Sequence, residues 1–158
     1  MSDDFIQIGQ ANFQRSDILG KPTTFEKGGQ KMNRVQLKNG LVFEFSEYES
    51  GMVRLSKQDN MEKVSIFMNN AKIYGDYSKD ETKDLAYNKL LLDVKGNNND
   101  IDTSKDAGGY NPECGCQSAV DDLIYVQGYG NTVTTGRSDI LKDKNTNEIH
   151  VSPKTYKI

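Results

Sequence analysis

The sequence predicts an all-β protein, on two observations. Short runs rich in Val, Ile, Leu, Phe and Tyr alternate with polar turns rich in Gly, Asn and Asp, which is the composition of strands joined by tight bends. The chain also lacks a convincing stretch in which apolar residues recur at the 3.6-residue spacing of an amphipathic helix. Its 158 residues suit one domain, and the 35 % hydrophobic share predicts a thin core.

The expected strands follow one another from residue 34. The first two form a hairpin around Asn39-Gly40, because both central positions of a type I′ turn need a positive φ. A two-residue turn would pair Val35 with Glu44, and the apolar side chains would then not sort onto one face. Further strands are expected at 51–56, 63–68, 70–75, 89–96, 99–103, 122–128, 131–136 and 148–152. Only 80–91 and 111–124 could be helical; the first lacks an apolar stripe and the second has few helix formers.

Two stretches repeat one pattern with an offset of 32 residues. LLDVKGNNNDIDT (91–103) and LIYVQGYGNTVTT (123–135) share L-[LI]-x-V-x-G-x-x-N-x-[IV]-x-T. A fainter copy, VSIFMNNAKIYG (64–75), keeps the seven-residue step between aliphatic residues, as do Val35 and Val42. A strand, a bend and a second strand at such a period are typical of a solenoid, in which Gly and Asn turn the corners.

These stretches resemble the coils of parallel β-helical proteins that act on polysaccharides or are attached to surfaces. The resemblance covers at most residues 60–136 and concerns fold, not activity. We therefore predict a short right-handed parallel β-helix, with residues 1–33 as a polar N-terminal arm or cap and 34–158 as a single β domain. The alternative is an antiparallel β-sandwich or barrel, in which VKGNNNDI and VQGYGNTV are hairpin loops.

Charge and hydropathy narrow the choice of partners. The net charge is −3, with 20 Lys and Arg scattered among 23 Asp and Glu. Nucleic acids and anionic membranes favour a basic footprint, so we expect neither as a partner. No apolar run approaches the roughly 20 residues of a transmembrane helix, and two cysteines fit a reducing compartment.

The start of the chain bears on localisation. MSDDFIQIGQ lacks the basic and apolar regions of a secretory signal. Its polar composition resembles the leaderless export signals of bacterial type III secretion substrates. We therefore expect a soluble protein that is either cytoplasmic or secreted by a leaderless route.

Cys114, Cys116 and His150 are the candidates for catalysis. A C-x-C pair can exchange thiols when one thiolate is stabilised, but no basic residue lies nearby in the sequence. As zinc ligands the two cysteines would need partners, and His150 is the one histidine of the chain. We expect no metal and no cofactor, and the sequence contains no G-x-S-x-G, P-loop or H-E-x-x-H motif.

A second group of residues points to binding. In a β-helix, Asp121 and Asp122 would lie at the mouth of a strand, and Tyr110, Tyr125 and Tyr129 would line a carbohydrate groove; otherwise these tyrosines are ordinary strand residues. We therefore predict a non-enzymatic binding or interaction module that contacts a protein or a glycan, as a secreted bacterial effector or a surface protein does. The alternative is a small thiol-dependent or hydrolytic enzyme that uses the Cys-x-Cys segment.

Overall fold

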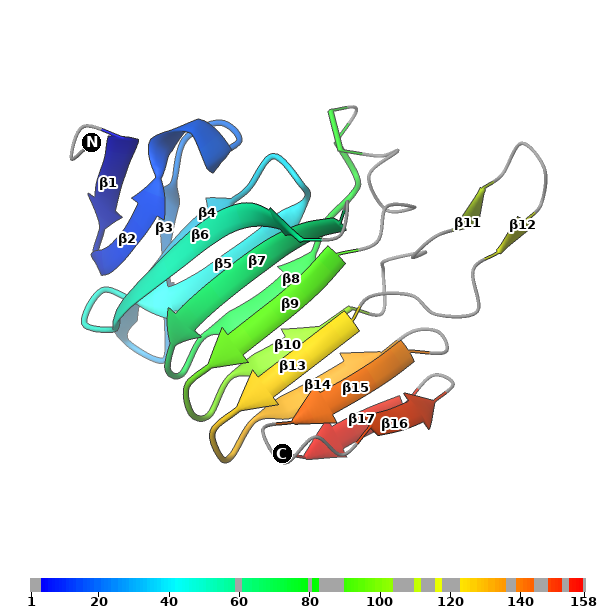
Figure 1. Ribbon diagram of the computed structural model, residues 1–158. Helices are drawn as coiled ribbons and strands as arrows, with labels where there is room; N and C mark the ends of the chain where they lie inside the picture. Colours follow the sequence, from blue (N-terminus) through cyan, green and yellow to red (C-terminus); the bar gives the residue numbers. More distant parts are fainter. Residues whose placement is uncertain are drawn as a thin grey trace.

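The computed structural model shows a chain built almost entirely of β-strands (Figure 1). It describes residues 4–58, 61–79, 81–82, 90–103, 110–111, 116–117, 123–135, 139–143, 148–151 and 154–157. These residues include no α-helix, and a short 3-10 helix covers Arg15–Asp17. The prediction of an all-β protein is therefore confirmed for the described part of the chain.

The strands follow one another through the whole chain. The first eight are β1 (Phe5–Ile8), β2 (Gln10–Gln14), β3 (Thr23–Lys27), β4 (Gln30–Gln36), β5 (Leu41–Ser46), β6 (Ser50–Gln58), β7 (Met61–Met68) and β8 (Lys72–Gly75). The others are β9 (Leu90–Lys95), β10 (Asp100–Asp102), β11 (Tyr110–Asn111), β12 (Cys116–Gln117), β13 (Leu123–Gln127), β14 (Thr132–Thr135), β15 (Asp139–Asp143), β16 (Glu148–Val151) and β17 (Lys154–Lys157). Every strand expected between residues 51 and 152 overlaps one of them. Of the two segments that could be helical, the described parts are a turn at 81–82 and strand residues; the rest lies outside the described residues.

The strands form two mixed sheets that face each other (Figure 1). The large sheet has the order β1-β2-β6-β7-β9-β13-β15-β16, the small sheet has the order β17-β14-β10-β8-β5-β4-β3, and β11 and β12 pair separately. Antiparallel pairs flank the parallel strands in both sheets, so the arrangement is also compatible with the sandwich-like alternative. The chain starts at one end of this stack and finishes at the other.

The core lies between the two sheets, because each strand turns alternate side chains inward. In β7, Val64, Ile66 and Met68 are buried, whereas Phe67 is exposed. At the N-terminal end of the core, the ring centre of Phe13 in the large sheet lies 5.8 Å from the ring centres of Phe43 and Phe45 in the small sheet. Burial of these apolar side chains is the main source of stability for such a fold.

The parallel strands pair in the register that the sequence offsets indicate. In the large sheet, Ile66 of β7 pairs with Val94 of β9, which pairs with Val126 of β13. In the small sheet, Ile73, Ile101 and Val133 form the equivalent inward row. The expectation for Val35 and Val42 is wrong. They lie in one antiparallel hairpin on opposite faces, so they are not equivalent positions of a coil, although Val35 continues the small-sheet row through Phe43, which pairs with Ile73.

The hairpin around Asn39-Gly40 is present, but its register differs from that of a two-residue turn. Val35 pairs with Phe43 because the loop has three residues, 38–40. The Leu37 amide donates to the Leu41 carbonyl at 2.8 Å, and the Asn39 Oδ1 accepts from the Leu41 amide at 3.0 Å. Gly40 has φ 98°, which only glycine adopts readily. The extra loop residue shifts the pairing by one, so the apolar side chains other than Val42 do sort onto one face.

Segment 1–33, expected to be an arm or cap, contributes strands to both sheets. β1 and β2 extend the large sheet beyond β6, and β3 pairs with β4 in the small sheet. Residue 33 falls inside β4 (Gln30–Gln36). The division into an arm and a domain, and the use of this segment in export, stay predictions.

Buried asparagines join the turns that connect the two sheets. The Asn99 side chain accepts from the Ala71 amide at 3.0 Å and donates to the Met68 carbonyl at 2.9 Å. One turn further along, Asn131 accepts from the Asn99 amide at 2.9 Å and donates to the Gly96 carbonyl at 3.0 Å. Both asparagines are at most 1 % exposed, so these amides satisfy groups that water does not reach.

Two glycines let the same turns stack closely. A Cβ atom on Gly96 would lie 1.7 Å from the Met68 carbonyl oxygen, and a Cβ on Gly128 would lie 1.9 Å from the Gly96 carbonyl oxygen. Both distances are far inside van der Waals contact. The shared Gly and Asn positions of the sequence pattern are thus the contact points between successive turns.

We expect Asn131→Ala to lower the free energy of unfolding by about 2–4 kcal/mol, because it leaves the buried Asn99 amide and the partly buried Gly96 carbonyl without this partner. The matched control is Asn12→Ala, at an exposed position of β2, which we expect to cost less than about 0.5 kcal/mol. Urea unfolding followed by far-UV circular dichroism measures both. Equal effects of the two substitutions would contradict the structural role of Asn131.

Candidate functional site

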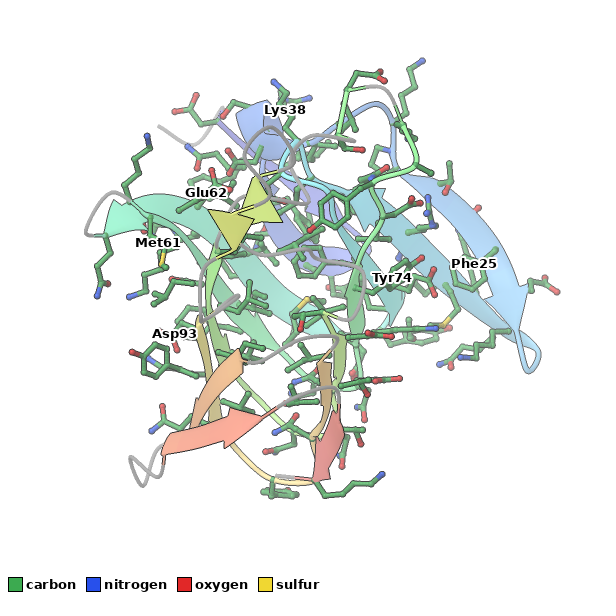
Figure 2. The ribbon with its side chains drawn as sticks, turned by 90° about the vertical axis from the view of Figure 1, so that its right-hand side faces the viewer. Phe25, Lys38, Met61, Glu62, Tyr74 and Asp93 are labelled. Carbon is green, nitrogen blue, oxygen red and sulfur yellow. The ribbon has the colours of Figure 1, made fainter. Side chains whose placement is uncertain are left out.

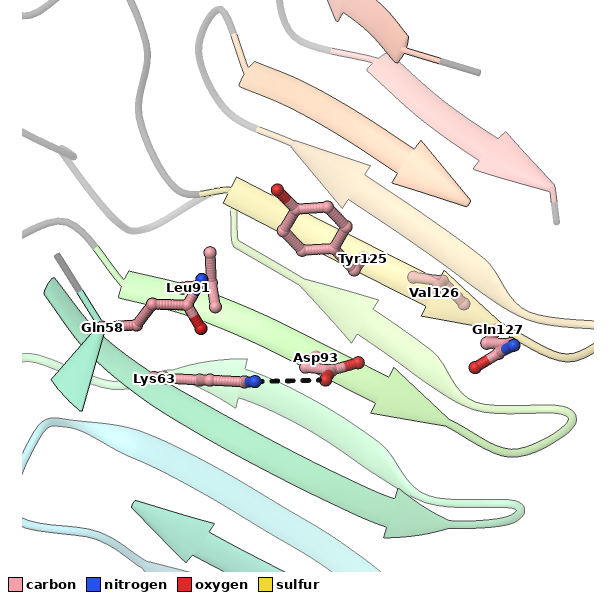
Figure 3. Close-up of a pocket in the computed structure, with 7 residues that line it drawn as sticks. All are labelled: Gln58, Lys63, Leu91, Asp93, Tyr125, Val126 and Gln127. Atoms are coloured by element: carbon pink, nitrogen blue, oxygen red, sulfur yellow. Dashed lines mark ion pairs between the residues drawn. The ribbon is translucent and has the colours of Figure 1, made fainter. Parts of the chain in front are cut away.

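The outer face of the large sheet carries a shallow hollow of about 390 Å³ (Figure 3). It is open to solvent on one side and lies over β6, β7, β9 and β13. Its lining residues are Gln58, Lys63, Leu91, Asp93, Tyr125, Val126 and Gln127. Most of them occupy outward positions, since their neighbours along each strand turn into the core.

Strand register brings the polar lining together. Asp93 of β9 pairs with Ser65 of β7 on one side and with Tyr125 of β13 on the other. The Lys63 Nζ lies 3.7 Å from the Asp93 Oδ2, and the two side chains are 27 % and 24 % exposed. The pair is thus partly exposed and long for an ion pair, and both charged groups reach the surface of the hollow.

The chemistry of this lining suits a ligand that has both apolar and hydrogen-bonding surfaces. The half-buried ring of Tyr125 offers a flat face that can stack on apolar C–H groups. Gln58 and Gln127 supply amide donors and acceptors, and Lys63 and Asp93 supply charged ones. An apolar platform with a few polar groups around it is the usual composition of a binding site.

Two further cations lie over aromatic rings on this face. The Arg54 guanidinium lies 5.7 Å from the centre of the Phe5 ring, and the Lys95 Nζ lies 5.3 Å from the centre of the Phe67 ring. Phe67 is 42 % exposed, so its ring keeps Lys95 at the surface rather than covering a core. These pairs hold the positive charges in place on the sheet.

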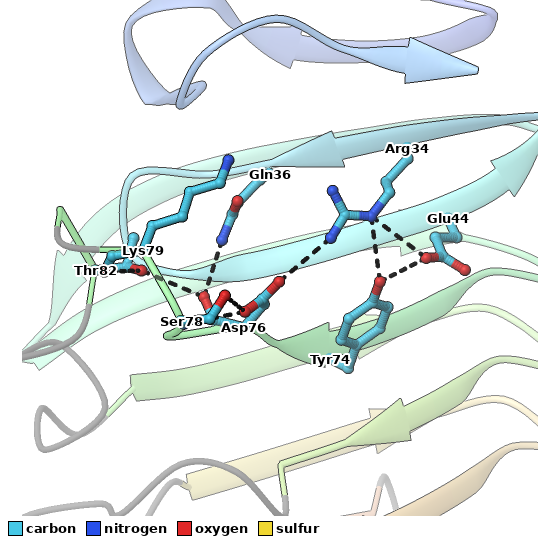
Figure 4. A network of polar contacts seen from close by, with 8 residues as sticks. All are labelled: Arg34, Gln36, Glu44, Tyr74, Asp76, Ser78, Lys79 and Thr82. Carbon is cyan, nitrogen blue, oxygen red and sulfur yellow. Dashed lines mark hydrogen bonds and ion pairs between the residues drawn. The ribbon is translucent and has the colours of Figure 1, made fainter. Parts of the chain in front are cut away.

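A polar network occupies the opposite face of the molecule (Figure 4). Figure 2 shows Tyr74 and Asp93 on opposite sides. The Tyr74 hydroxyl donates to Glu44 at 2.5 Å and accepts from the Arg34 Nε at 3.4 Å, and the Arg34 Nη2 lies 3.4 Å from the Asp76 Oδ2. Gln36 donates to the Asp76 carbonyl at 2.9 Å. The network connects β4, β5 and β8, where the small sheet changes from antiparallel to parallel pairing.

Burial and the hydrogen bond to Glu44 raise the pKa of Tyr74 above its usual value. The hydrogen bond to Tyr74 is likewise the main cause that raises the pKa of Arg34. The groups of the network thus satisfy one another, and we assign it to the fold rather than to ligand binding.

Among the tyrosines and aspartates predicted from the sequence, Tyr125 lies in the hollow. Tyr129 is 68 % exposed in the turn after β13 and does not line it. Tyr110 belongs to β11, and Asp121 and Asp122 lie outside the described residues. Their roles in binding stay predictions.

The residues of the predicted thiol site fall on separate segments. Cys116 belongs to β12 and His150 to β16, and these strands lie well apart in the view of Figure 1. Cys114 lies outside the described residues. No group of three or more His, Cys, Asp or Glu that could hold a metal ion occurs in the described part of the chain.

Sequence reasoning missed the partners of Tyr125 in the hollow. Gln58 and Lys63 lie on β6 and β7, more than 60 residues before Tyr125. The signal that could have found Lys63 and Asp93 is the parallel register itself, extended from the inward aliphatic residues to the outward positions between them.

Comparison with known proteins finds no match to this chain among family models, curated proteins or solved structures. Within the described residues, no helix has the length and apolar character needed to cross a membrane.

We expect Tyr74→Phe to lower the free energy of unfolding by about 1 kcal/mol at neutral pH, because the hydrogen bond to Glu44 is lost. The raised pKa of Tyr74 in the folded state means that its contribution is complete below about pH 10, the usual tyrosine value, and declines as the pH rises through the folded value. The difference between the two proteins should therefore shrink above about pH 10. Urea unfolding between neutral pH and about pH 11 measures this; a difference that grows at alkaline pH would contradict it.

Proposed function

We propose that the chain is a non-enzymatic binding module that holds an extended carbohydrate against the outer face of the large sheet. The observation that carries this proposal is the hollow around Tyr125, where one aromatic ring lies among two amides and one ion pair. A sugar presents C–H groups on the faces of its ring and hydroxyl groups around its rim. Stacking on Tyr125 and hydrogen bonds to Gln58, Gln127 and Asp93 would satisfy both surfaces at once.

The composition of the hollow supports binding rather than reaction. Its described lining contains no Ser, Cys or His, so it offers no usual pair of nucleophile and base. Hydrolysis of a glycosidic bond normally uses two carboxyl groups, and the described lining supplies Asp93 alone.

We further propose that β7–β8, β9–β10 and β13–β14 are three coils of a short right-handed parallel β-helix. The parallel pairings and the hydrogen bonds between successive turns support this description. Neighbouring strands in such a stack are about 4.8 Å apart. Outward residues at equivalent positions then form rows that run across the strands, and a linear polymer can follow these rows.

We expect oligosaccharide binding to change the amide NMR signals of β7, β9 and β13, with the largest changes around Tyr125. Tyr125→Ala should weaken binding about tenfold, the equivalent of roughly 1.4 kcal/mol, because the stacking ring is lost. Tyr125→Phe should keep most of the affinity. The readout is a titration with a panel of neutral and acidic oligosaccharides.

The matched control for this experiment is Tyr48→Ala. Tyr48 is 74 % exposed in the turn between β5 and β6, outside the hollow, and its substitution should leave affinity unchanged. Signal changes confined to the small sheet, or equal losses for Tyr125→Ala and Tyr48→Ala, would overturn the proposed function.

A further inference from the structure

The charges of the chain are divided unevenly between its two outer faces. The whole protein has a net charge of −3. On the outer face of the large sheet, however, the described positions of β6, β7, β9 and β13 carry the cations Arg54, Lys63 and Lys95 and the single acid Asp93. Three cations and one acid give these described positions a net charge of +2, on a protein whose net charge is −3.

The outer face of the small sheet is different. One row across it pairs Arg34 with Glu44, Glu44 with Lys72, and Lys72 with Asp100. Opposite charges directly across neighbouring strands stabilise a sheet and neutralise one another. On β6, β7, β9 and β13 of the large sheet, the described outward cation that has an acid beside it is Lys63, whose Nζ lies 3.7 Å from the Asp93 Oδ2.

Arg54 and Lys95, the other two outward cations at these described positions, lie over aromatic rings. Arg54 lies over Phe5 and Lys95 lies over Phe67, at 5.7 Å and 5.3 Å from the ring centres. An aromatic ring orients a cation without cancelling its full charge. Arg54 and Lys95 are both exposed, so each remains available to an anionic ligand.

The following inference rests on the proposed function. We propose that the ligand of this face is an acidic polysaccharide, a linear chain of sugars that carries carboxylates. Its sugar rings stack at Tyr125, and its carboxylates pair with Lys95, Arg54 and Lys63. Lys63 either leaves Asp93 for a ligand carboxylate or contacts both, since the Lys63–Asp93 pair is partly exposed and its Nζ–Oδ2 distance is 3.7 Å.

The spacing of the strands supports a polymer over a small anion. Tyr125 lies on β13, Lys95 on β9, Lys63 on β7 and Arg54 on β6, so these four residues occupy four consecutive strands. The strands are about 4.8 Å apart, which is close to the length of one sugar unit. A polysaccharide that crosses the strands therefore presents about one sugar to each of them.

The test compares polymers that differ in charge alone. Alginate and hyaluronate are each titrated against the full chain beside the same polymer whose carboxylates have been reduced to alcohols, with binding followed by calorimetry. We expect at least one native polymer to bind about tenfold or more tightly than its reduced form, and its affinity to fall several-fold between about 50 mM and about 300 mM NaCl.

Lys95→Gln and Lys72→Gln form the matched pair of variants. Each removes one positive charge from a lysine whose Nζ lies 5.3 Å from a ring centre, on Phe67 in the large sheet and on Tyr74 in the small sheet. We expect Lys95→Gln to weaken binding of the acidic polymer about three- to tenfold and Lys72→Gln to leave it unchanged. Far-UV circular dichroism confirms that both variants are folded.

Four outcomes overturn the inference. Equal binding of native and reduced polymers would leave the proposed carbohydrate function in place but remove the requirement for acid. Equal losses of affinity for the two lysine variants would show that positive charge on the large sheet has no special part in binding. Binding of polyglutamate as tightly as alginate or hyaluronate would assign the face to acidic protein segments. Binding of neither acidic polymer would also reject the inference, while the Tyr125 titration with neutral sugars tests the proposed function separately.

Discussion

The fold depends on hydrogen bonds that two buried asparagine side chains make between successive turns. Asn99 bonds to the backbone of the turn before it, and Asn131 bonds to the backbone of the turn that contains Asn99. Because both amides are buried, every one of these bonds satisfies a group that would otherwise be left without water. The turns are thereby fixed one above another, and the strands on either side inherit their register from them.

That constraint is visible in the sequence because it acts on residues at fixed places in each turn. Gly96 and Gly128 match, as do Asn99 and Asn131, because each position meets the same close approach or the same buried backbone group in successive turns. The parallel part of the fold could be anticipated for this reason. The position of the hairpin around Asn39-Gly40 could be predicted, but its strand register could not. A one-residue difference in loop length depends on hydrogen bonds that composition does not specify.

The parts that sequence reasoning missed lack such a fixed signal. β1, β2 and β3 are edge or near-edge strands with few buried residues, so their apolar pattern is weak. In the candidate site, Tyr125 could be proposed as an aromatic residue in a strand of the pattern. Its neighbours were missed because the pattern is carried by inward and turn residues: Asp93 lies at a variable position of the repeat, and Lys63 lies on a further strand. Outward residues are free to vary from turn to turn, and a varying residue leaves no repeat to detect.

The same freedom explains why a binding face can form on this fold. Inward positions must remain aliphatic and turn positions must remain Gly or Asn, whereas Ser65, Asp93 and Tyr125 share one outward row without sharing any property. On the small sheet the outward positions are used for ion pairs such as Arg34 with Glu44, which hold strands together. On the large sheet, the outward cations Arg54 and Lys95 lie over aromatic rings instead. Under the proposed function these cations meet the ligand, and function on this scaffold would lie in the outward rows rather than in the fold itself.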